Sequence, residues 1–456
     1  MGDPIVLLWL AISIAIILVL ILKLKMNAAL AMFVGALFMG FASGEGLSAT
    51  VSNISAGFGN TMKGIGLSVG FGVMLGQLIA DVGAVQTIAN KILKAFGEKK
   101  ADYALGATGF IVSIPVFYDV GVVILTPLAK QLSKKSSQKI LPAFIGALVA
   151  GLGIAHTFIP PTPGPMTGGE LLGVPIGTTI LWGIIIGLPT FILSMIVYNK
   201  VFLGNKKFWN PETCEEHDPI AEAEAAKRAE ELSVSEDKLP SFFAALLPIF
   251  LPIVLILLTT VWGAIAGNDN VPDFIKMLGS KEIAMLCGVI AAMIVCLSKK
   301  RMTLAQVEKS ITVSVASAGT VLLITGAGGG FGSVLTVSGV GEVLSNVLAS
   351  AHIPVIIFVW LIGALLRFAQ GSGTVAMITA ISLVSSMGTL GVSPILVALA
   401  AFSGSLGCAH VNDSGFWITT KIGGLTTEGG LKTYTLMCFL VSIISLALIL
   451  VASLFI

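Results

Sequence analysis

Long apolar segments make up most of the chain, and their spacing is that of helices that cross a membrane. An apolar helix needs about 20 residues to cross the hydrocarbon core of a bilayer. The pattern predicts five such helices in each half of the chain, at 4–22, 28–42, 62–82, 140–170 and 175–199, then at 242–266, 283–297, 312–336, 394–418 and 431–455. Two more apolar segments, 103–129 and 353–388, contain helix-breaking residues, and each predicts a re-entrant hairpin.

The two halves of the chain carry a repeated pattern of residues. Leu-Gly-x-Ala-His occurs at 152–156 and again at 406–410, a shift of 254 residues. Three further residues recur at a shift of 256, so that Gly76, Gly83 and Asn90 correspond to Gly332, Gly339 and Asn346. Repeated halves whose apolar segments are broken at matching places are typical of secondary transporters.

The number of crossings determines how the two halves are arranged. Each half has five, an odd number, so the second half must be inverted relative to the first. We therefore predict an all-α polytopic membrane protein of two inverted repeats, 1–205 and 241–456, with broken helices near the middle of the membrane. The polar segment 206–240, rich in Glu, Ala and Lys, separates them and predicts a solvated linker.

Positive charges near helix ends indicate the orientation, because Lys and Arg stay on the cytoplasmic side. The segments 91–100 and 134–139 are rich in Lys, whereas 43–60 and 340–352 contain neither Lys nor Arg. This asymmetry predicts that the linker is cytoplasmic and that both termini lie outside.

Composition supports a multi-pass protein of the cell membrane and argues against other classes. Hydrophobic residues make up 55% of the chain and charged residues 11%, with a mean hydropathy of +0.99, far from the composition of soluble domains. A net charge of only +2 gives no reason to expect a nucleic-acid partner. The five cysteines show no C-x-x-C spacing, so we expect free thiols, no metal site and no cofactor.

Helix-breaking residues coincide with charged or polar residues at four places inside the apolar segments. The segment 113–121 combines a proline, two aromatic residues and Asp119, and 160–165 contains four prolines, which a helix interior excludes. The second half has breaks at 367–374 and 410–417. Because a charge at membrane depth costs about 2.5 to 3.5 kcal/mol, we expect the four breaks to meet at a functional site.

The residues of these breaks suit an anionic organic substrate. Gly371 and Gly373 let a ligand approach backbone N–H groups, and helix N-termini attract a carboxylate. Asn412 and Ser414 can hydrogen-bond the hydroxyl groups of a polyol chain. The predicted substrate-binding residues are Ser113, Phe117, Tyr118, His156, Thr157, Pro160, Pro161, Thr162, Gly164, Arg367, Gly371, Ser372, Gly373, Thr374, His410, Asn412 and Ser414.

Two acids are candidates for proton coupling. An apolar surrounding disfavours the charged form of a carboxylic acid, so Asp119 is expected to take up and release a proton. The alternative is a structural acid at the hairpin turn. Asp413 is the second candidate, and it is either a coupling residue or a ligand for a backbone amide.

Arg367 and two histidines allow both functional and structural interpretations. Arg367 can bind the substrate carboxylate through its guanidinium fork, or it can pair with an acid such as Glu342 or with a lipid headgroup. His156 and His410 suggest a metal site or a proton relay, because histidine as a residue type titrates near neutrality. Each lies where a helix unwinds, however, so that its ring can instead satisfy a freed carbonyl.

These segments resemble the gluconate permeases, also called gluconate:proton symporters, of the ion transporter superfamily. The resemblance covers nearly the whole chain and is most specific at 117–121, 160–165, 326–332 and 410–417. It implies import of a sugar acid with protons, an elevator-type movement and a homodimer. The chain departs from the family pattern at Asp119, where Glu is common, and at Thr162, where His is common.

Three classes of function follow. The leading prediction is a secondary active transporter that imports gluconate or a similar hydroxy acid with protons. The alternative is an importer of D-serine or another small organic anion, including a sodium-coupled one. A channel or an enzyme is disfavoured, because the sequence contains neither a catalytic constellation nor a nucleotide-binding motif.

Overall fold

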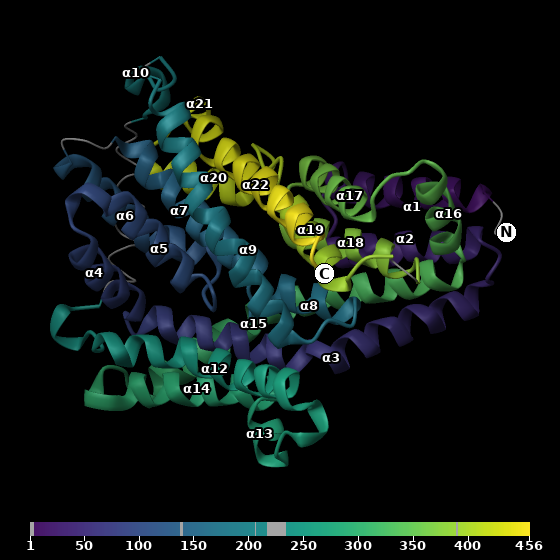
Figure 1. The fold of residues 1–456 in the computed structure, drawn as a ribbon, viewed down its shortest axis with the longest axis horizontal. Coiled ribbons are helices and arrows are strands. Elements are labelled where there is room, and N and C mark those ends of the chain that lie inside the picture. The colour runs from purple at the N-terminus through teal and green to yellow at the C-terminus, as the bar shows by residue number, and fades with distance from the viewer. Residues whose placement is uncertain (1–3, 137–139, 206, 217–233, 389–390) are drawn as a thin grey trace.

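The computed structural model describes residues 4–136, 140–205, 207–216, 234–388 and 391–456, and this part of the chain is almost entirely helical (Figure 1). Its one β-type pairing is an isolated bridge between Glu215 and Leu425. Eight of the described helices are long and apolar enough to cross a membrane. The number becomes nine if α16 (Val340–Ser350) and α17 (Val355–Gln370), bent by 115°, form one span. The chain is an all-helical, multi-pass membrane protein.

The first half is a series of helices interrupted at two breaks. They are α1 (Ile5–Leu22), α2 (Ala28–Ala42), α3 (Leu47–Asp81), α4 (Ala84–Phe96), α5 (Ala101–Val112), α6 (Tyr118–Lys135), α7 (Leu141–Phe158), α8 (Pro163–Leu171) and α9 (Ile176–Val197), followed by the π-helical turn η2 (Tyr198–Phe202). The breaks at 113–117 and 159–162 fall at the predicted hairpin tip and in the proline-rich segment. Proline lacks the N–H that would continue the helix.

The second half has the same kind of series. It contains α12 (Phe242–Ala266), α13 (Asp273–Leu278), α14 (Lys281–Leu297), α15 (Leu304–Val337), α16, α17, α18 (Gly373–Ser385), α19 (Pro394–Leu406), α20 (Ser414–Gly423), α21 (Thr427–Gly430), the π-helical η6 (Leu431–Thr435) and α22 (Leu436–Ala452). The connections between the longer helices contain the short helix α10 (Pro211–Cys214) and the 3₁₀ turns η1 (Glu98–Lys100), η3 (Glu236–Lys238), η4 (Asn268–Asn270) and η5 (Ser298–Lys300). Breaks at 371–372 and 407–413 again match the predicted positions.

Several predicted segments differ in length from the helices observed. The third span of the first half lies in α3, which has 35 residues, and that of the second half lies in α15, which has 34. Each helix is about 50 Å long at 1.5 Å per residue. Residues 47–60 of the segment 43–60 therefore belong to α3, whereas residues 340–350 of the segment 340–352 form the separate helix α16. By contrast, α2 has the predicted bounds 28–42, and the predicted span 394–418 is divided between α19, which has only 13 residues, and the start of α20.

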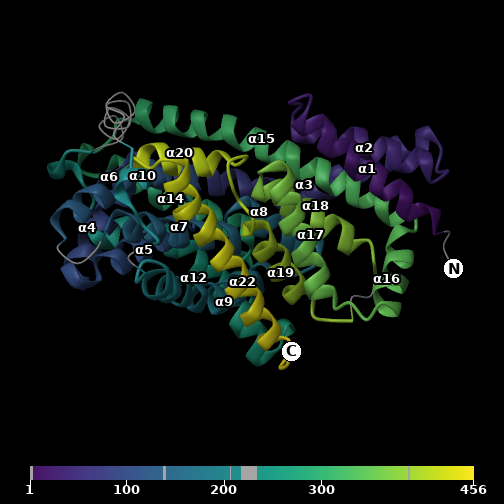
Figure 2. The same cartoon turned by 90° about the horizontal axis from the view of Figure 1, so that it is seen from above.

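The helices α3 and α15 run antiparallel along the molecule and pack closely (Figure 2). Near their crossing, a Cβ atom added to Gly57 would lie 2.5 Å from the carbonyl oxygen of Gly329. Towards the other end, the Ser310 hydroxyl donates to the Asp81 carboxylate at 2.5 Å. Glycine is needed at this crossing because only a residue without a side chain allows two helix backbones to approach so closely.

The described ends of the segment that joins the two halves are anchored, which differs from the expected solvated tether. Trp209 and Cys214 are buried, and the Cys214 carbonyl accepts a hydrogen bond from the Thr426 N–H at 3.0 Å. At its other end, the Pro240 carbonyl accepts a hydrogen bond from the Thr87 hydroxyl at 3.1 Å. Residues 206 and 217–233 of the predicted linker lie outside the described part.

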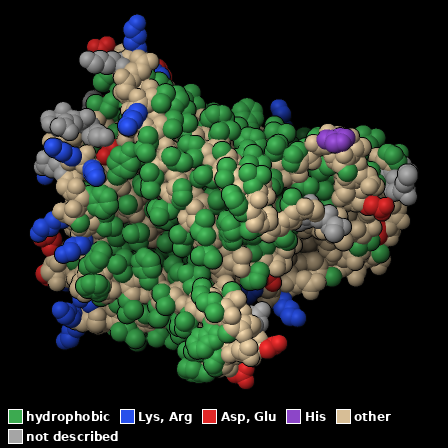
Figure 3. All heavy atoms as spheres, viewed as in Figure 1, with side chains coloured by type: hydrophobic (Ala, Val, Ile, Leu, Met, Phe, Trp, Pro, Cys, Tyr) green, Lys and Arg blue, Asp and Glu red, His purple; other side chains and the backbone are tan. Residues whose placement is uncertain are grey.

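The surface of the molecule separates apolar and positive regions (Figure 3). Hydrophobic side chains cover the middle of the face shown, whereas Lys and Arg gather at the left-hand edge, over α4, α6 and α10. Lys94, Lys134 and Lys135 lie in the last turns of α4 and α6, where cations interact favourably with the helix dipole.

Candidate functional site

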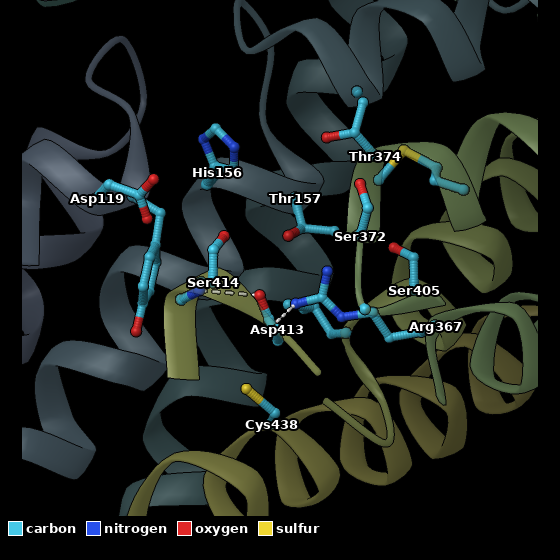
Figure 4. Close-up of a pocket in the computed structure, with 18 of the residues that line it drawn as sticks. Asp119, His156, Thr157, Arg367, Ser372, Thr374, Ser405, Asp413, Ser414 and Cys438 are labelled. Carbon is cyan, nitrogen blue, oxygen red and sulfur yellow. Dashed lines mark hydrogen bonds and ion pairs between the residues drawn. The ribbon is translucent and has the colours of Figure 1, made fainter. Parts of the chain in front are cut away.

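A cavity of about 430 Å³ lies where the helix breaks of the two halves meet (Figure 4). This volume falls in the usual range of small-molecule sites. Fourteen of the nineteen predicted site residues line it: Phe117, Tyr118, Asp119, His156, Thr157, Gly164, Arg367, Gly371, Ser372, Gly373, Thr374, Asn412, Asp413 and Ser414. The hairpin tips and the helix breaks therefore form one cavity, as the sequence predicts.

Five predicted residues do not line the cavity, because they satisfy backbone groups of the breaks instead or are buried beside them. The Ser113 hydroxyl donates to the Val116 carbonyl at 3.2 Å, and the Thr162 hydroxyl to the Ile159 carbonyl at 2.8 Å. The His410 ring is 3.1 Å from the Phe368 carbonyl. The remaining two are buried prolines, Pro160 and Pro161.

Nine lining residues were not predicted as site residues: Val149, Gly153, Gln370, Met377, Ser405, Leu406, Gly415, Tyr434 and Cys438. Most of them belong to regular helices rather than to the breaks. Helical spacing could have found two of these, because Val149 and Gly153 precede Thr157 at intervals of four residues along α7 and so share its face. Residues of η6 and α22 carry no such indication.

Arg367 and Asp413 form a buried ion pair that connects two of the breaks (Figure 4). Arg367 lies in the last turn of α17, and Asp413 is the N-cap of α20. The other carboxylate oxygen of Asp413, Oδ1, accepts a hydrogen bond from the Gly415 N–H at 2.9 Å, so the predicted contact with a backbone amide is present. Arg367 pairs with Asp413 rather than with Glu342 or a headgroup, since its guanidinium points inward.

The cavity contains polar atoms without partners. Among the described residues, no hydrogen bond is made by Arg367 Nε, Asn412 Oδ1 or His156 Nδ1, although all three atoms are buried. The orientation of the Asn412 amide is defined, because its Nδ2 donates to the Phe368 carbonyl at 2.6 Å and an oxygen could not do so. Buried polar groups normally have partners, so the wall of the cavity contains donor and acceptor atoms that are left unsatisfied.

Asp119 occupies the second position of α6 and is exposed to the cavity. In the view of Figure 4 it stands across the cavity from Ser372 and Thr374. Within the described part of the chain no donor forms a hydrogen bond with the Asp119 carboxylate, whereas Arg367, Gly415 and Tyr434 all donate to Asp413.

The two histidines of the repeated pentapeptide have different environments. His156 lines the cavity beside the Phe117 ring, with 5.9 Å between ring centroids. His410 stacks on Phe368 at 4.6 Å and faces the backbone of α17 outside the cavity. The His410 ring thus contacts a backbone carbonyl, that of Phe368. Nδ1 of His156 contacts no such group in the described structure.

Two glycines allow the break between α17 and α18 to approach the polar groups. Gly371 has a φ of +81°, a conformation that side chains disfavour, and a Cβ atom there would collide with the Asn412 carbonyl. A Cβ atom on Gly373 would lie 2.7 Å from Nη1 of Arg367. Both glycines are thus required for the position of the groups that face the cavity.

Comparison with known proteins agrees with this architecture. Residues 5–455 match the model of the GntP family permeases. The chain belongs to this family. It is 36% identical to an uncharacterized permease of Haemophilus influenzae, with 93% of this chain and 87% of the relative covered. It is also 32% identical to a high-affinity gluconate transporter of Escherichia coli, with 92% and 93% covered.

Among solved structures, this chain is similar to the YdaH transporter of Alcanivorax borkumensis. The TM-score is 0.62 at 15% identity, and 89% of each chain is covered. At this identity the similarity concerns the fold alone. Family membership and relatives make the chain a permease rather than an enzyme.

Proposed function

We propose that this permease is a secondary active transporter that imports gluconate or a similar hydroxy acid together with protons. One observation carries the proposal: the guanidinium-bearing Arg367, the amide-bearing Asn412 and several hydroxyl side chains line the same cavity. A guanidinium binds a carboxylate, and amide and hydroxyl groups hydrogen-bond hydroxyl groups. A hydroxy acid supplies both kinds of group.

Other groups of the cavity can bind the rest of such a substrate. Hydroxyl groups of Thr157, Ser372, Thr374 and Ser414 line its walls, and each can donate or accept a hydrogen bond. The other proposed binding residues that line the cavity contribute aromatic rings or glycine backbone: Phe117, Tyr118, His156, Gly164, Gly371 and Gly373. A site of this kind rejects analogues that lack the hydroxyl groups, because its own polar atoms would then stay unpaired.

The charges of the cavity support proton coupling at Asp119. The charged residues that line it in the described structure are Arg367, Asp413 and Asp119. Since Arg367 and Asp413 already neutralise each other, a substrate carboxylate would meet the negative charge of Asp119. Protonation of Asp119 removes this repulsion, so anion and proton binding favour each other. Asp413, held by the ion pair, is proposed as a secondary contributor to coupling.

We propose two inverted repeats, 1–205 and 241–456, joined by a cytoplasmic linker at 206–240, and an elevator-type movement. The antiparallel course of α3 and α15 supports the inversion. On α3, Gly72 would place a Cβ atom 3.0 Å from the Pro161 carbonyl, and Gly76 faces the Pro115 carbonyl still more closely. These glycines provide a smooth surface against which the two breaks of the first half can slide.

The second long helix has an equivalent surface. Gly328 and Gly332 of α15, which lie 256 residues after Gly72 and Gly76, face Ile378 and Ser382 of α18. The proposal places the protein as a homodimer in the inner membrane, with the lysine-rich edge of Figure 3 on the cytoplasmic side.

The test is uptake of labelled gluconate into proteoliposomes, with an inward proton gradient or an inward sodium gradient imposed separately. Accumulation driven by protons supports the proposal. Accumulation driven by sodium alone refutes the proton coupling. If gluconate is not accumulated under either gradient, the sugar-acid assignment is wrong, and competition by D-serine and small hydroxy acids for binding then identifies the class of substrate.

A further inference from the structure

Tyr434 lies in the π-helical turn η6, and its ring is almost fully buried, with 3% exposed. Its hydroxyl donates a hydrogen bond of 2.6 Å to Oδ2 of Asp413, the oxygen that also pairs with Arg367. Single π-helical turns occur frequently at functional sites. Tyr434 is therefore part of the cavity wall and also a direct partner of its ion pair.

Asp413 is surrounded by three donors from three elements. They are the guanidinium of Arg367 from α17, the hydroxyl of Tyr434 from η6 and the N–H of Gly415 from α20. These contacts fix the position of the carboxylate. The carboxylate in turn holds Nη2 of Arg367, which fixes the position of the guanidinium in the wall of the cavity.

We propose that Tyr434 is a positioning residue of the substrate site. Its hydroxyl holds the Asp413 carboxylate in place, and Asp413 orients Arg367 so that the guanidinium is presented to the carboxylate of the substrate. The inference rests on the proposed function for the identity of the bound anion only. A tyrosine that merely filled space would need its ring and not its hydroxyl.

The other titratable groups near Asp413 act on it without such a contact. Asp119 and Tyr118 face it from α6, and Cys438 faces it from α22. The Tyr118 hydroxyl is committed to Thr419 at 2.9 Å. His156 of α7 lies near Arg367 rather than near the carboxylate. Among the described residues, Tyr434 is thus the neutral side chain that donates to Asp413.

The first experiment measures gluconate binding to the purified permease. A hydrogen bond to a charged group contributes about 1.5 to 3 kcal/mol, so loss of the hydroxyl in Tyr434→Phe is expected to weaken binding about 10- to 100-fold. The matched control is Tyr198→Phe, because Tyr198 is also buried and donates its hydroxyl to η6, at the Lys432 carbonyl, but does not line the cavity. This control is expected to bind as the wild type does.

A second measurement separates positioning through Asp413 from a direct contact with substrate. If Tyr434 acts through Asp413, the Tyr434→Phe change adds little to the loss of binding already caused by Asp413→Asn. If the two losses add in full, or if Tyr434→Phe binds like the wild type, the inference is wrong.

An infrared measurement tests the same step without any substrate. The carboxylate bands that disappear in Asp413→Asn are expected to change frequency in Tyr434→Phe, because the hydrogen bond from the Tyr434 hydroxyl to Oδ2 is lost. Unchanged bands overturn the inference. This readout stands even if the wild type binds no sugar acid, in which case the proposed function fails and the role of Tyr434 is decided separately.

Discussion

Arg367 and Asp413 form an ion pair that joins the break after α17 to the start of α20. Both side chains are buried, with 10% and 6% exposed. The pair links the two breaks of the second half into one unit. It also explains why a chain so poor in charge keeps an arginine and an aspartate at this depth.

Removal of either partner of this ion pair is expected to destabilise the protein, because the other charge is left buried. Arg367→Ala or Asp413→Ala should lower the free energy of unfolding by about 3 to 5 kcal/mol, and the double variant should lose less than the sum. Thermal unfolding of purified protein tests this. Lys432→Ala is the control, since its ion pair with Glu428 is exposed and exposed pairs contribute little to stability. Additive losses would contradict the coupling.

Replacement of Asp119 by Asn should separate transport from the proton gradient. The amide cannot exchange a proton at working pH, but it keeps the shape of the side chain. We expect Asp119→Asn to lose accumulation driven by an inward proton gradient and to retain exchange of internal for external gluconate. Asp119→Glu, which restores the acid, should restore the accumulation. Undiminished proton-driven uptake by Asp119→Asn would show that the proton is carried elsewhere.

The positions of the helix breaks could be predicted because their cause is local. Pro160 and Pro161 lack backbone donors, and Gly371 adopts a left-handed conformation, so these residues interrupt a helix wherever it packs. The start of α3 could not be found in this way. Its first turns contain small polar residues such as Ser52, Asn53 and Ser55, which give no apolar segment, and the helix continues there because it packs against α15.

The residues on regular helices of the cavity could not be predicted for a different reason. The polar residues of α22 are Ser442 and Ser445, which hydrogen-bond with Ser403 of α19 rather than line the cavity, so the sequence of this helix does not indicate which residues meet the cavity. Tyr434 and Cys438 become lining residues only through the packing of η6 and α22 on the first half. The burial of the linker ends could not be predicted for the same reason, because Trp209 and Cys214 are buried by contacts with distant parts of the chain.

The two histidines of the repeated pentapeptide should respond differently to the same substitution. His156→Ala removes a cavity group whose Nδ1 has no partner in the described structure, so gluconate should bind about 2- to 10-fold more weakly, the value of one neutral hydrogen bond. His410→Ala is the matched variant, because His410 lies at the corresponding position outside the cavity. Its affinity for gluconate should equal that of the wild type. Equal losses in both variants would argue against a substrate contact at His156.

The amide of Asn412 should determine how strongly the substrate hydroxyl is recognised. Its Oδ1 is an acceptor without a partner, so gluconate should bind more tightly than 2-deoxygluconate in the wild type by about 5- to 150-fold, since an unpaired buried group costs about 1 to 3 kcal/mol. In Asn412→Ala this ratio should fall towards one. Binding of both acids to both proteins measures it, and an unchanged ratio would place the hydroxyl elsewhere in the cavity.

Two glycines of α3 offer a test of the surface that contacts the first hairpin tip. In Gly76→Ala the new methyl group would collide with the backbone carbonyl of Pro115, which cannot rotate away, so the free energy of unfolding should fall by about 1 to 3 kcal/mol. Gly70→Ala is the control, because a Cβ atom there meets no atom within 4 Å and alanine favours the helix by up to about 1 kcal/mol. Unfolding of both purified variants gives the comparison. If Gly76→Ala were as stable as Gly70→Ala, the tip at Pro115 would not be held against α3, and the glycine surface would lose its support as the contact along which the two parts slide.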